Sequence, residues 1–252
     1  MVLKALIALI ITVIYSTSFS VKGEPQRITL AVGHDHSAML AANYPIYRAN
    51  WEFIRHSLVL LGYEVTANPV PWARAKHLTQ IAKSDGLFIA ANFPGREKWA
   101  VLSNPIGYGI FGGFYHIDRK EAQDILAAVR LGDHDEILSN FHTEDLLQVA
   151  TAQEGFKLLF NHRVDRLIMS ESYGNYLLDT ELSHFREKLR FDPTFFEKRS
   201  LHIAFAKDNP RSLNVLKIVN QAIKLGFEKG LYRQAMEHYK VPARMRFEGG
   251  MD

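Results

Sequence analysis

Residues 85–106 read DGLFIAANFPGREKWAVLSNPI, and this stretch decides the fold. The turn pair Asp85-Gly86 precedes an apolar run at 87–91 that is short enough for a buried strand. A loop follows, running from Asn92 to a single cation, Arg96. Because a guanidinium pairs with a carboxylate through two parallel hydrogen bonds, Arg96 is a candidate for binding an anionic ligand group, with Asn92 beside it. The alternative is an ordinary solvated arginine on a surface loop.

Strands and helices alternate on the N-terminal side of this stretch. The patterns predict strands at 28–33 and 64–67 and helices at 47–61 and 71–84, with Gly62 ending the first helix. Between them, residues 34–37 form a polar loop at the carboxyl end of a strand, which is where ligands bind in open α/β sheets. Strand-helix-strand-helix-strand order predicts a parallel, right-handed α/β lobe.

A second set of elements follows, inserted into the sequence of the first lobe. Residues 108–115 and 201–206 are expected to be extended crossovers that join two lobes as a hinge. Between them we expect a helix or a helix-strand pair at 120–130 and a short helix at 136–141. A strand at 146–150, a helix at 151–162 and a strand at 166–170 complete this set. Thr151 and Glu154 have capping-box spacing. Helices at 214–226 and 231–239 should return to the first lobe. The predicted domains are therefore 21–113 with 203–252, and 114–202.

Composition excludes several classes of function. The chain of 252 residues has a net charge of +3 and no cysteine, which rules out disulfides, thiolate metal sites and a cysteine nucleophile. Basic residues are scattered and form no clustered stripe, so we expect no nucleic-acid partner. P-loop, dinucleotide and Gly-x-Ser-x-Gly patterns are missing from the sequence. We therefore expect no cofactor, no metal and no enzymatic activity.

The first 20 residues have the pattern of a secretory signal peptide. Lys4 precedes an apolar run at 5–15, and small residues at 16–20 suit cleavage after Ser20. The run is too short for a spanning helix, which needs about 20 apolar residues, although an uncleaved anchor is an alternative. We expect the mature protein in the periplasm, without a lipid anchor.

Taken in order, these segments resemble the extracytoplasmic solute-binding proteins of family 3, the polar amino acid ABC-transporter type. The resemblance lies in PWARA at 71–75, Asp85-Gly86, PGR at 94–96, SNPI at 103–106, NHRVD at 161–165 and KDNP at 207–210. It implies the two-lobed type II periplasmic binding fold, in which each lobe is a mainly parallel sheet flanked by helices and two hinge crossovers join the lobes.

The resemblance also implies site residues, and this sequence departs from the family at several of them. Arg96 matches the arginine that binds the ligand's α-carboxylate, but Ala91 stands where a hydroxyl is usual. The acid that receives the α-amino group falls at Ser170, and Glu171 could replace it only after a register shift. A ligand-capping turn of the second lobe is matched loosely at 132–134, including Asp133 and His134. These departures favour a ligand with an anionic group and no ammonium.

Other candidate residues have structural alternatives of similar weight. Trp72 and Arg74, at a helix start, could cover a ligand by stacking and charge, or could serve the core and a surface ion pair. His34 is a candidate for a pocket-lining loop. In an extended segment His34 and His36 would share one face while Asp35 points away, and a metal site there is a weaker interpretation.

Four tyrosine positions complete the set of candidates. Tyr47, with Tyr44, is a candidate aromatic wall or a helix-packing residue. Tyr173 and Tyr176 are candidates for the second lobe's side of the pocket.

The predicted function is that of a periplasmic receptor. It would capture a small anionic or zwitterionic, amino acid-like solute between two lobes and deliver it, as a monomer, to an inner-membrane ABC permease. One alternative is a ligand sensor that acts on a membrane signalling protein. Another is a dehydratase-like enzyme on the same fold, with His34, His36 or Glu171 as acid-base groups.

Overall fold

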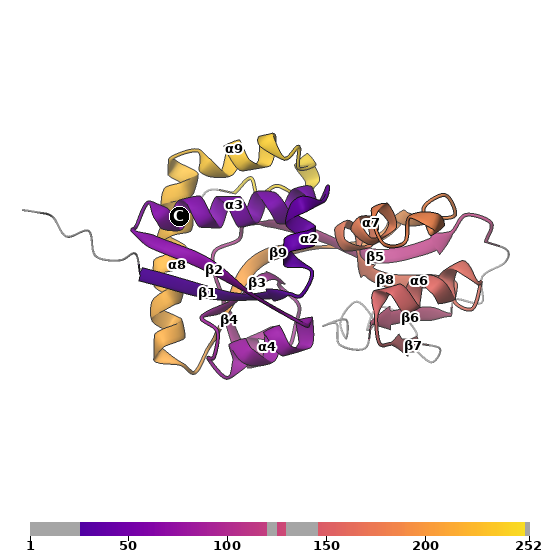
Figure 1. The fold of residues 1–252 in the computed structure, drawn as a ribbon, viewed down its shortest axis with the longest axis horizontal. Coiled ribbons are helices and arrows are strands. Elements are labelled where there is room, and N and C mark those ends of the chain that lie inside the picture. Colours follow the sequence, from indigo (N-terminus) through magenta and orange to yellow (C-terminus); the bar gives the residue numbers. More distant parts are fainter. Residues whose placement is uncertain (1–25, 120–124, 130–145, 250–252) are drawn as a thin grey trace, which may run out of the picture.

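The computed structural model describes residues 26–119, 125–129 and 146–249. They form two α/β lobes, placed end to end along the long axis of the molecule (Figure 1). The first lobe contains both the N-terminal elements and the C-terminal helices, and the second contains the middle of the chain. This insertion is the arrangement that the sequence predicts.

Nine strands of the described chain join in one sheet, in the order β2-β1-β3-β9-β5-β8-β6-β7, with β4 pairing with β9. The strands are β1 (Gln26–Gly33), β2 (Tyr63–Val70), β3 (Gly86–Ala91), β4 (Ala100–Leu102), β5 (Gly107–His116), β6 (Leu126–Val129), β7 (Leu146–Val149), β8 (Arg166–Ser170) and β9 (Leu189–Ala206). In each lobe the earliest strand lies in the middle, and its two neighbours are parallel to it: β1 between β2 and β3, and β6 between β7 and β8.

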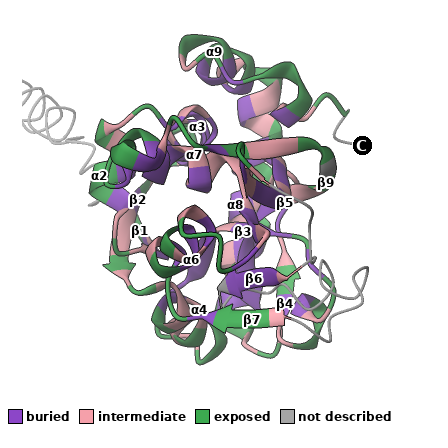
Figure 2. Cartoon of the chain, turned by 90° about the vertical axis from the view of Figure 1, so that its right-hand side faces the viewer, coloured by how far each residue is buried: buried purple, intermediate pink, exposed green. Residues whose placement is uncertain are grey.

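Helices cover both sides of these strands. In the first lobe, α3 and α9 lie on one side of the sheet and α4 lies on the other (Figure 1). The helices are α2 (His36–Ala41), α3 (Pro45–Val59), α4 (Trp72–Gln80), α6 (Ala152–Phe160), α7 (Glu171–Asp179), α8 (Pro210–Glu228) and α9 (Leu231–His238), with the short 3-10 turns η1 (Arg96–Lys98), η3 (Ser183–Phe185) and η4 (Ala243–Met245). The central strands are largely buried, whereas the outer faces of the helices are exposed (Figure 2).

Two antiparallel strands connect the lobes. β5 and β9 pair from Gly107 opposite Leu201 to His116 opposite Leu189, with an irregularity between Gly112 and Phe114. β9 also pairs with β3 of the first lobe, and β5 pairs with β8 of the second. The predicted domain boundaries at 113/114 and 202/203 fall inside these two strands and stay a prediction.

Local sequence signals explain how the elements near the site begin and end. The Thr151 side chain caps α6 by accepting a hydrogen bond from the Glu154 N–H at 3.1 Å, and the Glu154 carboxylate accepts one from the Ala150 N–H at 2.9 Å. This is the predicted cap, with the glutamate bound one residue earlier than in a standard capping box. After α3, Gly62 takes the left-handed conformation with φ of 79°.

Two local predictions differ from the structure, and others lie outside the described residues. The predicted loop at 34–37 is partly helical, because α2 begins at His36. The return strand is much longer than the predicted 201–206, since β9 starts at Leu189. Residues 120–124 and the short helix predicted at 136–141 lie outside the described residues, as does the predicted signal peptide. In the described part of the chain, no helix is long and apolar enough to cross a membrane.

Candidate ligand-binding site

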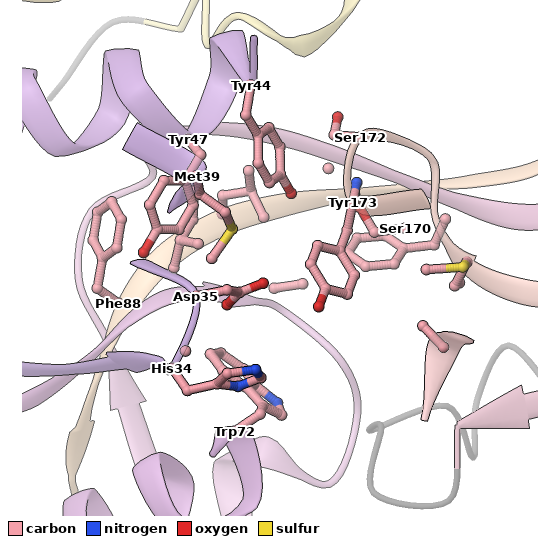
Figure 3. A pocket seen from close by; sticks show the side chains of 18 of the residues that line it. His34, Asp35, Met39, Tyr44, Tyr47, Trp72, Phe88, Ser170, Ser172 and Tyr173 are labelled. Atoms are coloured by element: carbon pink, nitrogen blue, oxygen red, sulfur yellow. Dashed lines mark hydrogen bonds between the residues drawn. The ribbon is translucent and has the colours of Figure 1, made fainter. Parts of the chain in front are cut away.

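A cavity of about 440 Å³ lies between the two lobes. In the described chain its lining draws on the ends of β1, β3 and β8 and the N-terminal turns of α4, α6 and α7. The lining residues are Gly33, His34, Asp35, Met39, Tyr44, Ile46, Tyr47, Pro71, Trp72, Ala73, Phe88, Ile89, Ala91, Phe93, Arg96, Gly109, Phe111, Ala150, Thr151, Ala152, Gln153, Met169, Ser170, Ser172, Tyr173 and Leu201. Figure 3 shows a close-up of this cavity. Most of these side chains are apolar or aromatic, as is typical of small-molecule sites.

The turn after β1 brings a carboxylate into the cavity. Asp35 precedes the first helical residue of α2, and its carboxylate points into the cavity from the first lobe toward Tyr173 of the second (Figure 3). Gly33 leaves room for this side chain, since a Cβ at that position would lie 2.8 Å from an Asp35 carboxylate oxygen. The backbone at the end of β1 is therefore shaped around Asp35.

The loop after β3 brings a guanidinium to the same cavity. Gly95, in the left-handed conformation with φ of 84°, turns the chain so that η1 begins at Arg96. The Arg96 side chain is only 4% exposed and lines the cavity. Its guanidinium lies over the Trp99 ring, 5.6 Å from the ring centroid. Because β1 and β3 are adjacent and parallel, Asp35 and Arg96 follow neighbouring strands at the same edge of the sheet.

An aromatic cluster forms the first lobe's side of the cavity. The Tyr47 hydroxyl lies 2.7 Å from Nδ1 of His36, and the Phe88 ring packs edge-on against Tyr47 with centroids 5.4 Å apart. The His36 ring also packs against Trp51, at 4.6 Å between centroids. Burial lowers the pKa of His36, so the imidazole is neutral around pH 7 and the cluster contributes no charge to the cavity.

Helix N-termini and hydroxyl groups form the second lobe's side. Residues 150–153, around the N-terminus of α6, line the cavity, and so do Ser170 and Tyr173 at the start of α7. The Ser170 side chain caps α7 by accepting from the Tyr173 N–H at 3.5 Å. Helix N-termini carry a partial positive charge and N–H groups without intrahelical acceptors. This side therefore offers hydrogen-bond donors and no full charge among its described lining residues.

Tyrosine rings bridge the two sides of the cavity. Tyr44 of the first lobe stacks on Tyr176 of the second, with centroids 5.6 Å apart and ring planes 18° apart. Tyr176 in turn stacks on Tyr173 at 5.9 Å. Burial raises the pKa of Tyr44, Tyr47 and Tyr173, and the negative charge of Asp35 raises it further. All three phenols therefore stay neutral hydrogen-bond donors at physiological pH.

Half of the ten predicted ligand-binding residues line the cavity: Arg96, Trp72, Tyr47, His34 and Ser170. Three others lie elsewhere. Asn92 and Arg74 are exposed outside the lining. Glu171 pairs with Arg244 through both carboxylate oxygens, at 2.6 and 2.8 Å, and is not a lining residue. Asp133 and His134 are outside the described residues.

One expectation about the loop after β1 is wrong. Because the chain turns into α2 at once, Asp35 faces the cavity with His34, and His36 points into the core. Asp35 also brings a carboxylate to the cavity, which the departures at Ala91 and Ser170 did not indicate. The expectation of a ligand without an ammonium group stays a prediction. The sequence signal was present: polar residues at the carboxyl end of a strand, in a position where a turn can aim any of them at a ligand.

The N-terminus of α6 is the other part of the site that sequence reasoning missed. Thr151 was recognised only as a helix cap, although it follows β7 at the same edge where ligands bind. No group of three or more potential metal ligands occurs among the described residues.

The sequence itself matches no protein-family model and no curated protein. Solved structures do match. One is a histidine kinase sensor domain with similarity to periplasmic binding proteins, at TM-score 0.69 and 14% identity, covering 86% of this chain and 97% of that one. Another is ArtJ, the arginine-, lysine-, histidine-binding protein of Geobacillus stearothermophilus, at TM-score 0.66 and 12% identity, covering 85% and 95%.

A third is AncCDT-1, an ancestral amino acid-binding protein that is a precursor of cyclohexadienyl dehydratase. Its TM-score is 0.63 at 18% identity, covering 84% of this chain and 95% of that one. Together these likenesses show that the chain has the type II periplasmic binding protein fold, as the sequence predicted. Most of these structural neighbours are binding proteins or sensor domains.

Proposed function

We propose that this protein is an exported receptor that captures a small anionic or zwitterionic, amino acid-like solute between its lobes. The observation that carries the proposal is the buried guanidinium of Arg96 at the wall of a cavity between the lobes. An arginine in a largely apolar site attracts an anion more strongly than one in water, because the local dielectric is low. A carboxylate is the group that its planar fork fits best.

The second lobe supplies the complementary contact. The N-terminus of α6, around Thr151, would donate backbone hydrogen bonds to the carboxylate that Arg96 holds from the first lobe. Trp72 and Tyr47 would pack on the apolar part of the ligand. Such a ligand touches both lobes only when they are closed, so it favours the closed state over the open one.

Movement between those states would occur at the crossover strands. β5 and β9 are the elements that pass from lobe to lobe, and the irregularity in their pairing between Gly112 and Phe114 is a place where they can bend. The closed form would then be recognised by an inner-membrane partner. We infer that this partner is an ABC permease, and that residues 1–20 direct export to the periplasm.

A sensor role is the second candidate, and the likeness to a histidine kinase sensor domain favours it. Both roles need the same ligand-dependent closure, and they differ only in the membrane partner. A neighbouring gene for a permease and ATPase would support transport, whereas a neighbouring gene for a membrane kinase or cyclase would support signalling.

A thermal-shift screen against amino acids, organic acids and sugars tests the receptor proposal. A ligand that binds the folded state raises the melting temperature in proportion to RT ln(1 + [L]/Kd). Arg96→Ala should abolish that shift and leave the ligand-free protein folded, while the exposed Arg74→Ala should retain it. An unchanged ligand affinity in Arg96→Ala would refute the anchor role, and a screen without any stabilising solute would refute the receptor.

A further inference from the structure

The charges that line the cavity restrict its ligand. Among the described lining residues there is one carboxylate, Asp35, and one permanently charged cation, Arg96, beside the imidazole of His34. Because charged groups are costly to desolvate, a ligand should bring groups whose charges are complementary to those of the lining. A second ligand carboxylate would find no second arginine or lysine among these residues, and a second ligand cation would find no second acid.

Asp35 is placed to receive a positive group. No lysine, arginine or histidine in the described chain forms a salt bridge with Asp35. By contrast, Glu171, the first residue of α7, is paired with Arg244. The glycine at position 33 leaves space for the Asp35 carboxylate at the cavity wall. The site therefore holds a partly buried negative charge that a ligand cation can neutralise.

The rings around Asp35 suit an ammonium group. Tyr44 and Tyr173 lie near its carboxylate in the cavity, and Tyr173 faces it from the opposite lobe (Figure 3). Neutral phenol rings attract a cation through their π faces. An ammonium at Asp35 would touch both lobes and thus contribute to closure.

Apolar side chains form much of the remaining lining. Phe88, Phe93, Phe111 and Leu201 lie along the part of the lining that β3, β5 and β9 provide, and Met169 adds a flexible side chain from the second lobe. A cavity of about 440 Å³ can take an aromatic side chain in addition to the two charged groups.

We propose that the ligand is an amino acid with a single carboxylate, a single ammonium group and a large apolar or aromatic side chain, and that Asp35 binds the ammonium. This inference rests on the proposed receptor function and narrows its ligand class. It assigns both ligand charges to the first lobe: the carboxylate to Arg96 and the ammonium to the turn after β1. Dicarboxylic and basic amino acids should bind much more weakly.

Three matched probes test the proposal by calorimetry on the whole protein: L-phenylalanine, 3-phenylpropanoate without the ammonium, and phenethylamine without the carboxylate. The unmodified protein should bind L-phenylalanine at least 10-fold more tightly than either analogue. Asp35→Asn should weaken L-phenylalanine by 10-fold or more and leave 3-phenylpropanoate unchanged or tighter. Asp208→Asn, which removes an exposed carboxylate outside the cavity lining, is the matched control and should change neither.

Several results would overturn the assignment. Equal affinity for L-phenylalanine and 3-phenylpropanoate would show that no group recognises the ammonium. Equal weakening of both probes in Asp35→Asn, with circular dichroism unchanged, would show that Asp35 only shapes the cavity. Stabilisation of the protein by other solutes, but by none of L-phenylalanine, L-tryptophan and L-leucine, would refute this ligand class and leave the receptor function standing. Stabilisation by no solute at all would remove both.

Discussion

The two walls of the cavity differ in the kind of interaction that they offer. The first lobe's wall, at the ends of β1 and β3, contains Asp35 and Arg96, which are charged side chains held by a glycine before each turn. The second lobe's wall contains hydroxyl groups and helix N-termini, with no charged side chain among its described lining residues. Under the proposed receptor function, this difference predicts that the first lobe would select the ligand by charge and that the second lobe would respond to its presence by closing.

This asymmetry has a physical advantage. Charged groups bind strongly but must be desolvated, which is easiest at a wall that is already shaped and partly buried. Backbone N–H groups and hydroxyls lose less hydration free energy than charged groups when the cavity closes. A lobe whose lining has only these groups can therefore open and close with a small change in free energy. Each prediction below tests one side of this contrast.

The largest effect is expected from the charged wall. Arg96→Gln replaces the guanidinium by a shorter, neutral amide that keeps an NH2 donor. The affinity for a carboxylate ligand should fall by about 100-fold, since losing one member of a buried charge pair costs about 2–5 kcal/mol. Titration calorimetry with the best solute from the thermal-shift screen measures this change. The exposed Arg74→Gln serves as control, and a loss below about 5-fold would contradict the anchor role.

A smaller effect is expected from the neutral wall. Thr151→Val removes the acceptor that caps α6, which should lower the free energy of unfolding by about 1 kcal/mol and weaken the ligand only a few-fold, because the backbone donors of the helix remain. Chemical denaturation and calorimetry give the two quantities. Asn209→Ala removes the comparable cap of α8, where the Asn209 side chain accepts from the Ser212 N–H at 3.0 Å, far from the lining. It should cost similar stability without affecting the ligand.

The core of the first lobe should respond to acid. Burial lowers the pKa of His36 and of His202, which donates from Nδ1 to the Ser103 carbonyl at 2.6 Å, below the 6.5 of an unfolded histidine. The unfolded chain therefore binds more protons than the folded one as the pH falls through 6.5, and stability is lost in that direction. Melting temperatures measured from pH 8 to pH 5 should be flat above about 6.5 and fall below it. A melting temperature that rises on acidification over this range would contradict the sign.

The smallest effect is expected at the pair that links η4 to the start of α7. The Arg244 side chain is 48% exposed, so its bond to Glu171 should contribute less than about 1 kcal/mol to the free energy of unfolding despite its two short contacts. Glu171→Gln and Arg244→Gln, with the double variant, measure this as a coupling energy. Because Glu171 lies outside the lining, ligand affinity should not change, and a large loss would place Glu171 in the binding site after all.

Local patterns in the sequence were enough for most of the fold. The strand predicted at 166–170 matches β8 residue for residue, and the helix cap at Thr151 forms as its spacing indicated. Both signals depend on residues within one turn or one strand, where backbone preferences and side-chain hydrogen bonds act directly. Pairing between distant strands was harder to predict from the sequence. For example, β9 extends twelve residues N-terminal to the predicted start at Leu201.

The same distinction between local signals and long-range packing applies to the candidate site. The sequence by itself determined that the loop after β3 carries Arg96 at the ligand edge of an α/β sheet, and the structure places Arg96 there, buried in the lining. Only the tertiary structure decided that Asp35 faces the cavity and that Arg74, Asn92 and Glu171 do not. The direction of a side chain in a turn depends on one or two backbone angles and on which element packs behind it. The sequence therefore set the order of the elements along the chain and the position of the buried cation, whereas the packing of α2 and the approach of the second lobe decided which carboxylate shares the cavity with it.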